Sequence, residues 1–302
     1  MSTPTAPDPQ GATTLRKTVG PWQVMLYGIG SMLGAGIYAL IGEVAGVMGS
    51  MVWLAFAAAM VAALLTGFTY ACVGSRFPKA AGAAYVTQHA FRIPWLSYVV
   101  GISVMMSGLT SMATGSQAIA RNVIAKIAPV AAAPAPPATA GSVTPSKPKI
   151  SAEPLRVKFT AIGLVGLLGL VIFAGIRQSM WLNMVCTVIE VSGLLFIIAV
   201  GIKYWGTTSY TELPPAASSD GSPFLLLLVL QGAVLTFFAF IGFEDILNVS
   251  EEVVQPERNV PRGLIGAMLV STVVYMAVAI TAVSVLPWQT LAASKAPLMD
   301  VA

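Results

Sequence analysis

Long apolar runs alternate with short polar segments along most of the chain. Seven runs are long enough, at roughly 20 residues, to cross the hydrocarbon core of a bilayer as helices. They cover about 24–47, 51–73, 95–119, 159–176, 180–201, 223–247 and 263–286. The runs are continuously apolar with Gly, Ala, Ser and Thr interspersed, whereas strands of a membrane β-barrel would alternate polar and apolar residues. The pattern therefore predicts an all-α integral membrane protein with about seven transmembrane helices.

The segments between the runs are polar and differ in character. Residues 1–20 form a polar tail, and residues 204–222 form a polar loop. Residues 129–154 are rich in Pro and Ala, a composition typical of extended loops. Residues 76–94 are too polar to span and are expected to lie at the membrane interface or to dip into the membrane. Because the first apolar run is too long for the core of a signal peptide, we expect it to be retained as a span.

The composition agrees with a membrane protein. Of 302 residues, 56% are hydrophobic and only 9% are charged, whereas about 25% are charged in an average soluble domain. The net charge of +4 comes from basic residues scattered between the apolar runs, which favours contact with a lipid bilayer and argues against nucleic acid binding. Cys72 and Cys186 both lie within apolar runs, so a disulfide scaffold is excluded. With one histidine, His89, and no nucleotide-binding loop, we expect no metal, no cofactor and no enzymatic chemistry.

Glycine is unusually frequent in the first run. The segment GIGSMLGAGIYALIGEVAG, residues 28–46, contains six glycines, each of which costs a helix up to about 1 kcal/mol relative to alanine. One interpretation is a close helix-packing face, for which Gly30 and Gly34 supply the GxxxG spacing. The other is a helix that unwinds near Gly34 to Gly36, so that free N–H groups of a second half-helix point at a buried anion. This run alone does not separate the two interpretations.

The sixth run carries a second interruption. Its segment LTFFAFIGFEDILNVSEE, residues 235–252, has Gly242 near the centre, followed by Glu244 and Asp245. An aspartate at the centre of a span costs about 2.5–3.5 kcal/mol on insertion scales, so these acids need a cavity, a partner or a proton. A pair of glycine-interrupted spans in corresponding positions of two halves is the sequence feature that best indicates a transporter binding site. The sixth run therefore favours the unwound interpretation of the first.

These two segments resemble a known family. GSMLGAGIYALIGEVAG (30–46) and FFAFIGFEDILNVSEEVVQPERNVPRGLI (237–265) are similar to the first and sixth spans of the amino acid–polyamine–organocation superfamily of permeases. The GEVAG stretch that contains Glu43 is most similar to the cationic amino acid branch of this superfamily. The resemblance implies two inverted repeats of five helices, a fold of the leucine-transporter type. Twelve spans are usual in the family, so we expect this chain to be an N-terminal portion, truncated after about seven helices.

The resemblance also implies an organisation and an orientation. Residues 1–20 would be a cytoplasmic tail, and 21–203 the first repeat, with the 129–154 loop outside the cell. Residues 204–222 would be a second outer loop and 223–302 the start of the second repeat. The basic residues divide eight against eight between the two sides and give no orientation by themselves. We expect a multi-pass protein of the plasma membrane with a cytoplasmic N-terminus.

By resemblance, a bound amino acid would lie between the two interruptions, which offer donors and acceptors without a charged side chain. Its carboxylate would bind the backbone N–H groups of Ala35, Gly36 and Ile37. Its amine would meet the carbonyl groups of Ser31, Met32, Phe238 and Ile241, close to Gly242. The rings of Phe238, Phe240 and Phe243 could close over the substrate, and ordinary packing is the alternative for each.

Polar residues inside the spans are candidates for coupling and gating. In the fifth run Asn183, Thr187 and Glu190 are spaced i, i+4 and i+7 and share one helix face. Desolvation disfavours a charged Glu190, which suits a proton carrier; a protonated Glu190 bonded to a nearby carbonyl is the alternative. Part of the family has a lysine at the matching position in place of a sodium ion, and the reversed charge argues against that mechanism here.

The remaining acids within the runs are weighed in the same way. Glu244 is a candidate gate or proton-sensing group, and Asp245 a structural partner inside the bundle. Glu43 is a further candidate for coupling or gating because it also lies within an apolar run.

We therefore expect secondary active transport of an amino acid, with a cationic substrate as a candidate, by alternating access with proton coupling or exchange. Two alternatives remain: a non-transporting remnant of such a permease, and a seven-helix receptor-like protein. A retinal pump is excluded because the run 263–286 contains no lysine.

Overall fold

The computed structural model describes residues 17–79, 82–127, 155–214, 222–294 and 296–302. Within these ranges the regular structure is helical, apart from an isolated parallel bridge between Val19 and Val253. The chain forms two compact units, one made of the residues up to Ile93 and from Met180 onward, the other of Pro94–Ser179. The tail before Lys17 and the predicted 129–154 loop lie outside the described residues.

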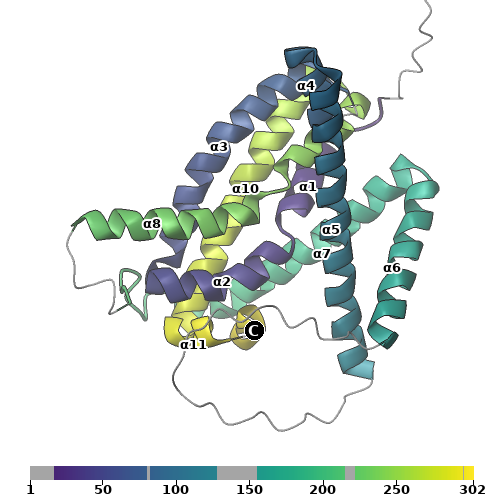
Figure 1. The fold of residues 1–302 in the computed structure, drawn as a ribbon. Helices are drawn as coiled ribbons and strands as arrows, with labels where there is room; N and C mark the ends of the chain where they lie inside the picture. Colours follow the sequence, from purple (N-terminus) through teal and green to yellow (C-terminus); the bar gives the residue numbers. More distant parts are fainter. Residues whose placement is uncertain (1–16, 80–81, 128–154, 215–221, 295) are drawn as a thin grey trace, which may run out of the picture. The chain divides into compact units, whose positions relative to one another are not determined.

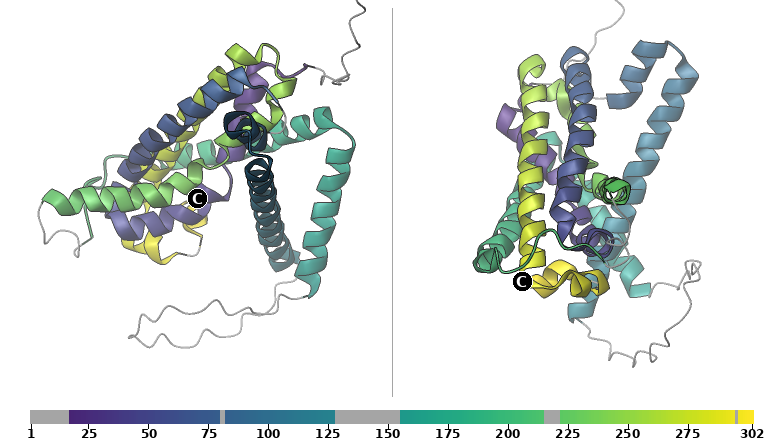
Figure 2. Two further views of the ribbon diagram at one scale, coloured as in Figure 1. Left: turned by 45° about the horizontal axis from the view of Figure 1, so that its top comes forward. Right: turned by 90° about the vertical axis from the view of Figure 1, so that its left-hand side faces the viewer.

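The larger unit is a bundle of long helices joined by short turns (Figures 1 and 2). Its long helices are α1 (Pro21–Met32), α2 (Ala35–Met48), α3 (Val52–Arg76), α7 (Ile176–Gly201, from Met180 onward), α8 (Ser222–Phe237) and α10 (Pro256–Val285). Its short helices are α4 (Gly82–Phe91), α9 (Ile246–Val249), α11 (Trp288–Ala293) and α12 (Pro297–Val301). The 3-10 turns are η1 (Gly49–Met51), η2 (Ile202–Tyr204), η4 (Phe238–Phe240), η5 (Phe243–Asp245) and η6 (Ser250–Glu252).

The smaller unit is a pair of helices, α5 (Pro94–Ile127) and α6 (Leu155–Phe173). They pack against each other, and a small apolar cluster contains Ala120 of α5 with Val157 and Ala161 of α6. Several hydroxyl groups of α5 donate to carbonyls of the preceding turn, as the Ser103 hydroxyl does to Val99 at 2.8 Å. These polar side chains are therefore satisfied within their own helix.

Six helical stretches of the described chain are long and apolar enough to cross a membrane. The first of them, Leu40–Arg76, covers the end of the first predicted run and all of the second, and the other five correspond to the third to seventh runs. The first predicted run is divided between α1 and α2. The all-α prediction is confirmed. The segment between the second and third runs, expected at the interface, contains the short helix α4.

The helix that contains the seventh run begins earlier in the chain than the apolar pattern predicted. The helix α10 begins at Pro256, because a proline at the first helical position needs no N–H partner. Arg258 and Arg262, which precede the predicted run, therefore lie in the first turns of α10. Ahead of α10, Glu251 of η6 forms an ion pair with Lys79 at 3.1 Å.

Small residues allow helices to pack closely against α3. Ala55, Ala59, Ala63, Gly67 and Ala71 recur at every fourth position and are buried, which places them along one face of the helix. Both α10 and α8 pack on α3, and α10 runs beside it in Figures 1 and 2. Because neighbouring backbones can approach over small side chains, such faces stabilise helix contacts in lipid.

Connecting segments tie the helices together at both ends of the larger unit. Next to η1, the Trp53 indole donates a hydrogen bond to the Tyr210 carbonyl at 3.1 Å. Near α4, the chain ahead of α1 pairs with the chain ahead of α10: the Val19 amide donates to the Glu252 carbonyl at 3.0 Å, and the Val254 amide donates to the Val19 carbonyl at 2.9 Å. These hydrogen bonds therefore join the segment just before α1 to the segment just before α10.

Candidate functional site

The first predicted span is interrupted at its middle. The helix α1 ends at Met32, the next two residues leave the helix, and α2 begins at Ala35. Gly34 is extended, with a ψ of −154°. The first N–H groups of α2, which include those of Gly36 and Ile37, have no carbonyl partner within the helix. The prediction that this run unwinds is confirmed.

The sixth predicted span is interrupted as well. The helix α8 passes into the turn η4, Ile241 is extended with a ψ of 132°, and Gly242 has a φ of +123°. Residues with a side chain rarely adopt such a φ, so the turn requires glycine. The chain then resumes as η5 and α9.

The two interruptions lie against each other. A methyl group added at Gly242 would overlap the main-chain carbonyl of Ser31 in the last turn of α1. A methyl group added at Gly36 would lie 3.0 Å from the Cα atom of Ala239 in η4. Each interruption thus places a glycine against the backbone of the other. The predicted site residues Ser31, Gly36 and Gly242 are brought together in this way.

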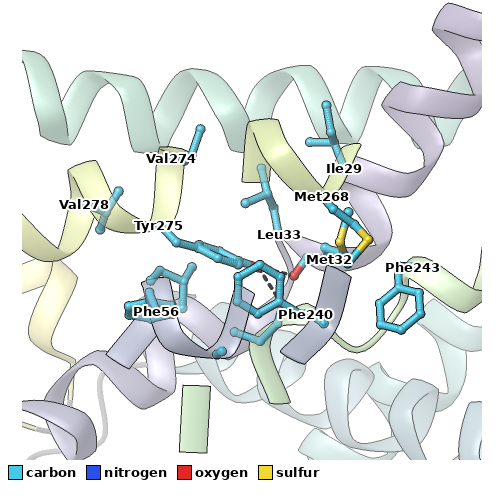
Figure 3. Close-up of a cluster of buried hydrophobic side chains, with 14 of the residues drawn as sticks. Ile29, Met32, Leu33, Phe56, Phe240, Phe243, Met268, Val274, Tyr275 and Val278 are labelled. Atoms are coloured by element: carbon cyan, nitrogen blue, oxygen red, sulfur yellow. Dashed lines mark hydrogen bonds between the residues drawn. The ribbon is translucent and has the colours of Figure 1, made fainter. Parts of the chain in front are cut away.

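Tyr275 of α10 bonds to both interruptions. Its hydroxyl lies 2.5 Å from the Met32 carbonyl and 2.8 Å from the Ala239 carbonyl. The ring is fully buried between Phe56 and Phe240, with centroids 5.3 Å and 5.4 Å away, as Figure 3 shows. Tyr275 is not among the site residues predicted from the sequence. The available signal was a single tyrosine in the middle of the apolar run 263–286.

Comparison with known proteins identifies the family. Residues 19–302 match the family model described as amino acid permease. The chain belongs to this family. Together with the six candidate spans, this makes it an all-α, multi-pass membrane protein of the amino acid–polyamine–organocation superfamily.

Individual relatives agree with this assignment. The chain is 28% identical to the cationic amino acid transporter 9, chloroplastic, of Arabidopsis thaliana, over 97% of this chain and 51% of that protein. It is 28% identical to the methylthioribose transporter of Bacillus subtilis (strain 168), over 91% of this chain and 56% of the relative. It is 25% identical to the branched-chain amino acid permease BcaP of the same organism, over 92% of this chain and 57% of that permease. The chain spans about half the length of these curated relatives.

In this permease-family chain, the two acids after the second interruption have local partners. The Gly242 amide donates to the Glu244 carboxylate at 2.8 Å, so Glu244 caps the turn that begins at Gly242. The Asp245 side chain lies near that of Ser31 of α1, and the Asn248 amide lies 3.4 Å from the Asp245 carboxylate. Asp245 therefore lies where the second interruption packs against the first helix.

The polar face of α7 lies against α1. The Thr187 hydroxyl donates to the Asn183 carbonyl at 2.8 Å. A methyl group added at Gly30 would overlap the Thr187 hydroxyl and would lie 3.4 Å from Oδ1 of Asn183. That Oδ1 atom is buried and has no hydrogen-bond partner among the described residues. Glu190, on the same face, is partly buried and close enough to Tyr275 and Tyr38 to act on both electrostatically.

Not all of the remaining predicted residues lie at the site. Phe240 and Phe243 are buried in the apolar core, which fits ordinary packing, whereas the side chains of Phe238 and Ile241 are exposed. Glu43 is exposed on α2, roughly two turns beyond its start. Among the residues that the structure describes, no cluster of side chains is suited to hold a metal ion.

Proposed function

We propose that the chain transports amino acids across a membrane by alternating access, with the substrate bound between the two helix interruptions. The observation that carries this proposal is the contact of the interruptions in the core of the larger unit, where Gly242 lies against Ser31 and Gly36 against Ala239. Interrupted helices meeting inside a membrane protein supply unpaired N–H and carbonyl groups at a depth where water is absent.

The substrate carboxylate would bind the first N–H groups of α2, those of Ala35, Gly36 and Ile37. Two facts support this: α2 begins at Ala35, and the N-terminus of a helix attracts negative charge. The substrate ammonium group would bind the carbonyls at the ends of the opposing segments, those of Ser31, Met32, Phe238 and Ile241. The site then needs no charged side chain to hold a zwitterion.

Proton coupling through Glu190 is the second part of the proposal. Glu190 is a partly buried acid in the span α7 and acts electrostatically on Tyr275, which touches both interruptions. Ionisable side chains inside membrane spans mark proton pathways in pumps and transporters. Exchange of one substrate for another without a proton is the alternative mode.

The substrate class and the membrane are the third part of the proposal. Cationic amino acids are the first candidates, because relatives from Arabidopsis thaliana are named cationic amino acid transporters. Branched-chain amino acids and methylthioribose are the others, after the two Bacillus subtilis relatives. We place the protein in the plasma membrane with its N-terminus in the cytoplasm.

Reconstitution tests the proposal. Purified chain in proteoliposomes is given labelled L-arginine, L-leucine or methylthioribose, and uptake is compared with that of empty liposomes. Uptake of at least one compound, abolished by Gly36→Val and retained by Gly163→Val, is expected. A methyl group at Gly36 meets Ala239, whereas the corresponding position at Gly163 opens into free space. A folded chain that takes up none of the three contradicts the proposal and favours a non-transporting remnant.

A further inference from the structure

The segment that follows α7 is bound to three other elements of the larger unit. The sequence predicts a polar loop over 204–222, and the structure describes it up to residue 214. Residues 205–213, which we call the strap, come directly after the turn η2. The side chains of Tyr210 and Leu213 pack against the apolar core. The strap is therefore part of the folded larger unit.

The first attachment of the strap is to the last turns of α10. The Trp205 indole donates to the Thr281 hydroxyl at 3.0 Å, and the hydroxyls of Tyr210 and Ser284 lie 2.9 Å apart. The Ser284 hydroxyl donates its one proton to the Ile280 carbonyl at 2.7 Å, so it accepts from Tyr210. Both hydrogen bonds to α10 therefore depend on donors that the strap supplies.

The second attachment is to the turn between α2 and α3. The Ser50 amide of η1 donates to the Glu212 carbonyl at 2.9 Å, and the Trp53 indole donates to the Tyr210 carbonyl at 3.1 Å. A methyl group added at Gly49, whose φ is +61°, would overlap the Glu212 carbonyl. The main chain of the strap therefore lies directly against this turn.

The third attachment is to α11. The Trp288 indole donates to the Glu212 carboxylate at 3.3 Å. α11 also packs on α2, where a methyl group added at Gly42 would overlap the Leu291 carbonyl. The strap thus joins α10, the α2–α3 turn and α11 at one end of the larger unit.

The helix α2 links the strap to the helix interruptions. It begins at Ala35, in the first interruption, and ends at Met48, next to η1. A helix of 14 residues is about 20 Å long. The strap therefore holds the far end of the helix whose first N–H groups face the proposed site.

The attachments are of a kind that can be released. Trp205 is 39% exposed and Glu212 is exposed as well. Water can replace the partners of such groups, so the net free energy of each hydrogen bond is small. Several of these bonds together make a fastening that is stable and still reversible.

We propose that the strap is a releasable fastening of the larger unit: its bonds to α10, η1 and α11 part before the far end of α2 moves and opens a substrate route along α2 to the interruptions. The control of a substrate route rests on the proposed function. The joining of the three elements rests on the contacts alone, so the two claims are tested separately.

Hydrogen–deuterium exchange of the Ser50 amide tests the fastening. The double variant Trp205→Phe/Tyr210→Phe removes both donors to α10 and leaves the Glu212 carbonyl, the partner of Ser50, in place. The Ser50 amide therefore responds only if the strap acts as one unit. Exchange in the peptide 47–53 of the reconstituted full chain should become about tenfold faster. Unchanged exchange overturns the fastening.

Tyr204→Phe is the matched control, since the Tyr204 hydroxyl lies just before the strap and bonds to no residue that the structure describes. Its exchange in the peptide 47–53 should equal that of the unsubstituted chain, and an equal rise in control and double variant also overturns the fastening. Trp205→Phe alone is measured beside the double variant and should give a smaller rise in the same peptide. It keeps the test decisive if the double variant does not fold.

Binding kinetics test the control of the route. The compound that the unsubstituted chain takes up is mixed with purified chain in a stopped-flow experiment. Because the strap does not touch the proposed site, its release should raise the association and dissociation rates together, each about tenfold, and leave Kd within about twofold. A changed Kd with an unchanged association rate overturns the gating role. Absence of uptake by the unsubstituted chain contradicts the proposed function and this role with it, and the exchange measurement still decides the fastening.

Discussion

The main chain at Gly242 lies against the carbonyl of Ser31 with no side chain between them. This contact joins the start of the second interruption to the last turn of α1. Position 242 requires glycine for two reasons. A side chain there would overlap the Ser31 carbonyl, and the φ of +123° is unfavourable for any residue with a side chain.

The first prediction concerns this contact. Gly242→Ala should lower the free energy of unfolding by about 2–4 kcal/mol, because backbone strain and overpacking each cost about 1–3 kcal/mol. Thermal unfolding in detergent measures the effect. Gly108→Ala is the matched control, since Gly108 is a helical glycine with open space around it. Equal stability of the two variants would show that the contact does not constrain the fold.

The side-chain contact between Ser31 and Asp245 gives a second prediction. Ser31→Ala and Asp245→Ala each remove one of the two polar side chains that lie near each other where α1 contacts η5. Their effects on unfolding should be non-additive by about 1 kcal/mol, as found for residues in contact. A double-mutant cycle with the two single variants and the double variant measures this coupling. Strict additivity would mean that the two side chains act independently.

A third prediction tests a polar contact between two spans. The buried Thr236 hydroxyl of α8 lies 2.9 Å from the Gly232 carbonyl and 3.0 Å from the Ala55 carbonyl of α3. Thr236→Val keeps the shape and removes the donor, so stability should fall by about 1 kcal/mol, the size of such bonds in lipid. The exposed Thr66 bonds only to its own helix, at the Ala62 carbonyl, and Thr66→Val should have little effect. A larger loss in the control would contradict the assignment.

The fourth prediction separates proton coupling from exchange. Glu190→Gln cannot release or take up a proton, so uptake driven by an imposed pH gradient should fall at least about tenfold while exchange of internal for external substrate persists. Proteoliposomes loaded with substrate, with and without the gradient, measure both modes. Glu43→Gln is the control, because Glu43 is exposed on α2. Undiminished gradient-driven uptake in Glu190→Gln would remove Glu190 as the proton carrier.

The apolar pattern and the glycines predicted more of the structure than any single motif did. Runs of about 20 apolar residues have few alternatives to a spanning helix, because backbone groups must pair within lipid. The interruptions near Gly34 and Gly242 were predictable because glycine is costly in a helix unless the backbone needs it. Ser31, Gly36 and Gly242 follow from the same signal, aided by the resemblance to permeases.

What the sequence could not provide is pairing between distant segments. Tyr275 looks like one more apolar residue in its run, and its role appears only when α10 lies beside Met32, 243 residues earlier. Likewise, Arg258 and Arg262 interrupt the apolar pattern, so the pattern did not predict the first turns of α10. Pro256 was nevertheless a valid signal for the start of a helix. For Phe238, Phe240 and Phe243, spacing alone could not say which rings enter the core.

The hydrogen bonds that join Val19 to Glu252 and Val254, and Tyr275 to Met32, have a consequence for the order of assembly. During synthesis α1 enters the membrane first, yet its partners in η6 and α10 emerge more than 200 residues later. Contacts of such long sequence separation form slowly, because loop closure precedes any gain from them. The two interruptions therefore come into contact late in folding. Although α1 is synthesised first, it is among the last helices to form its native contacts.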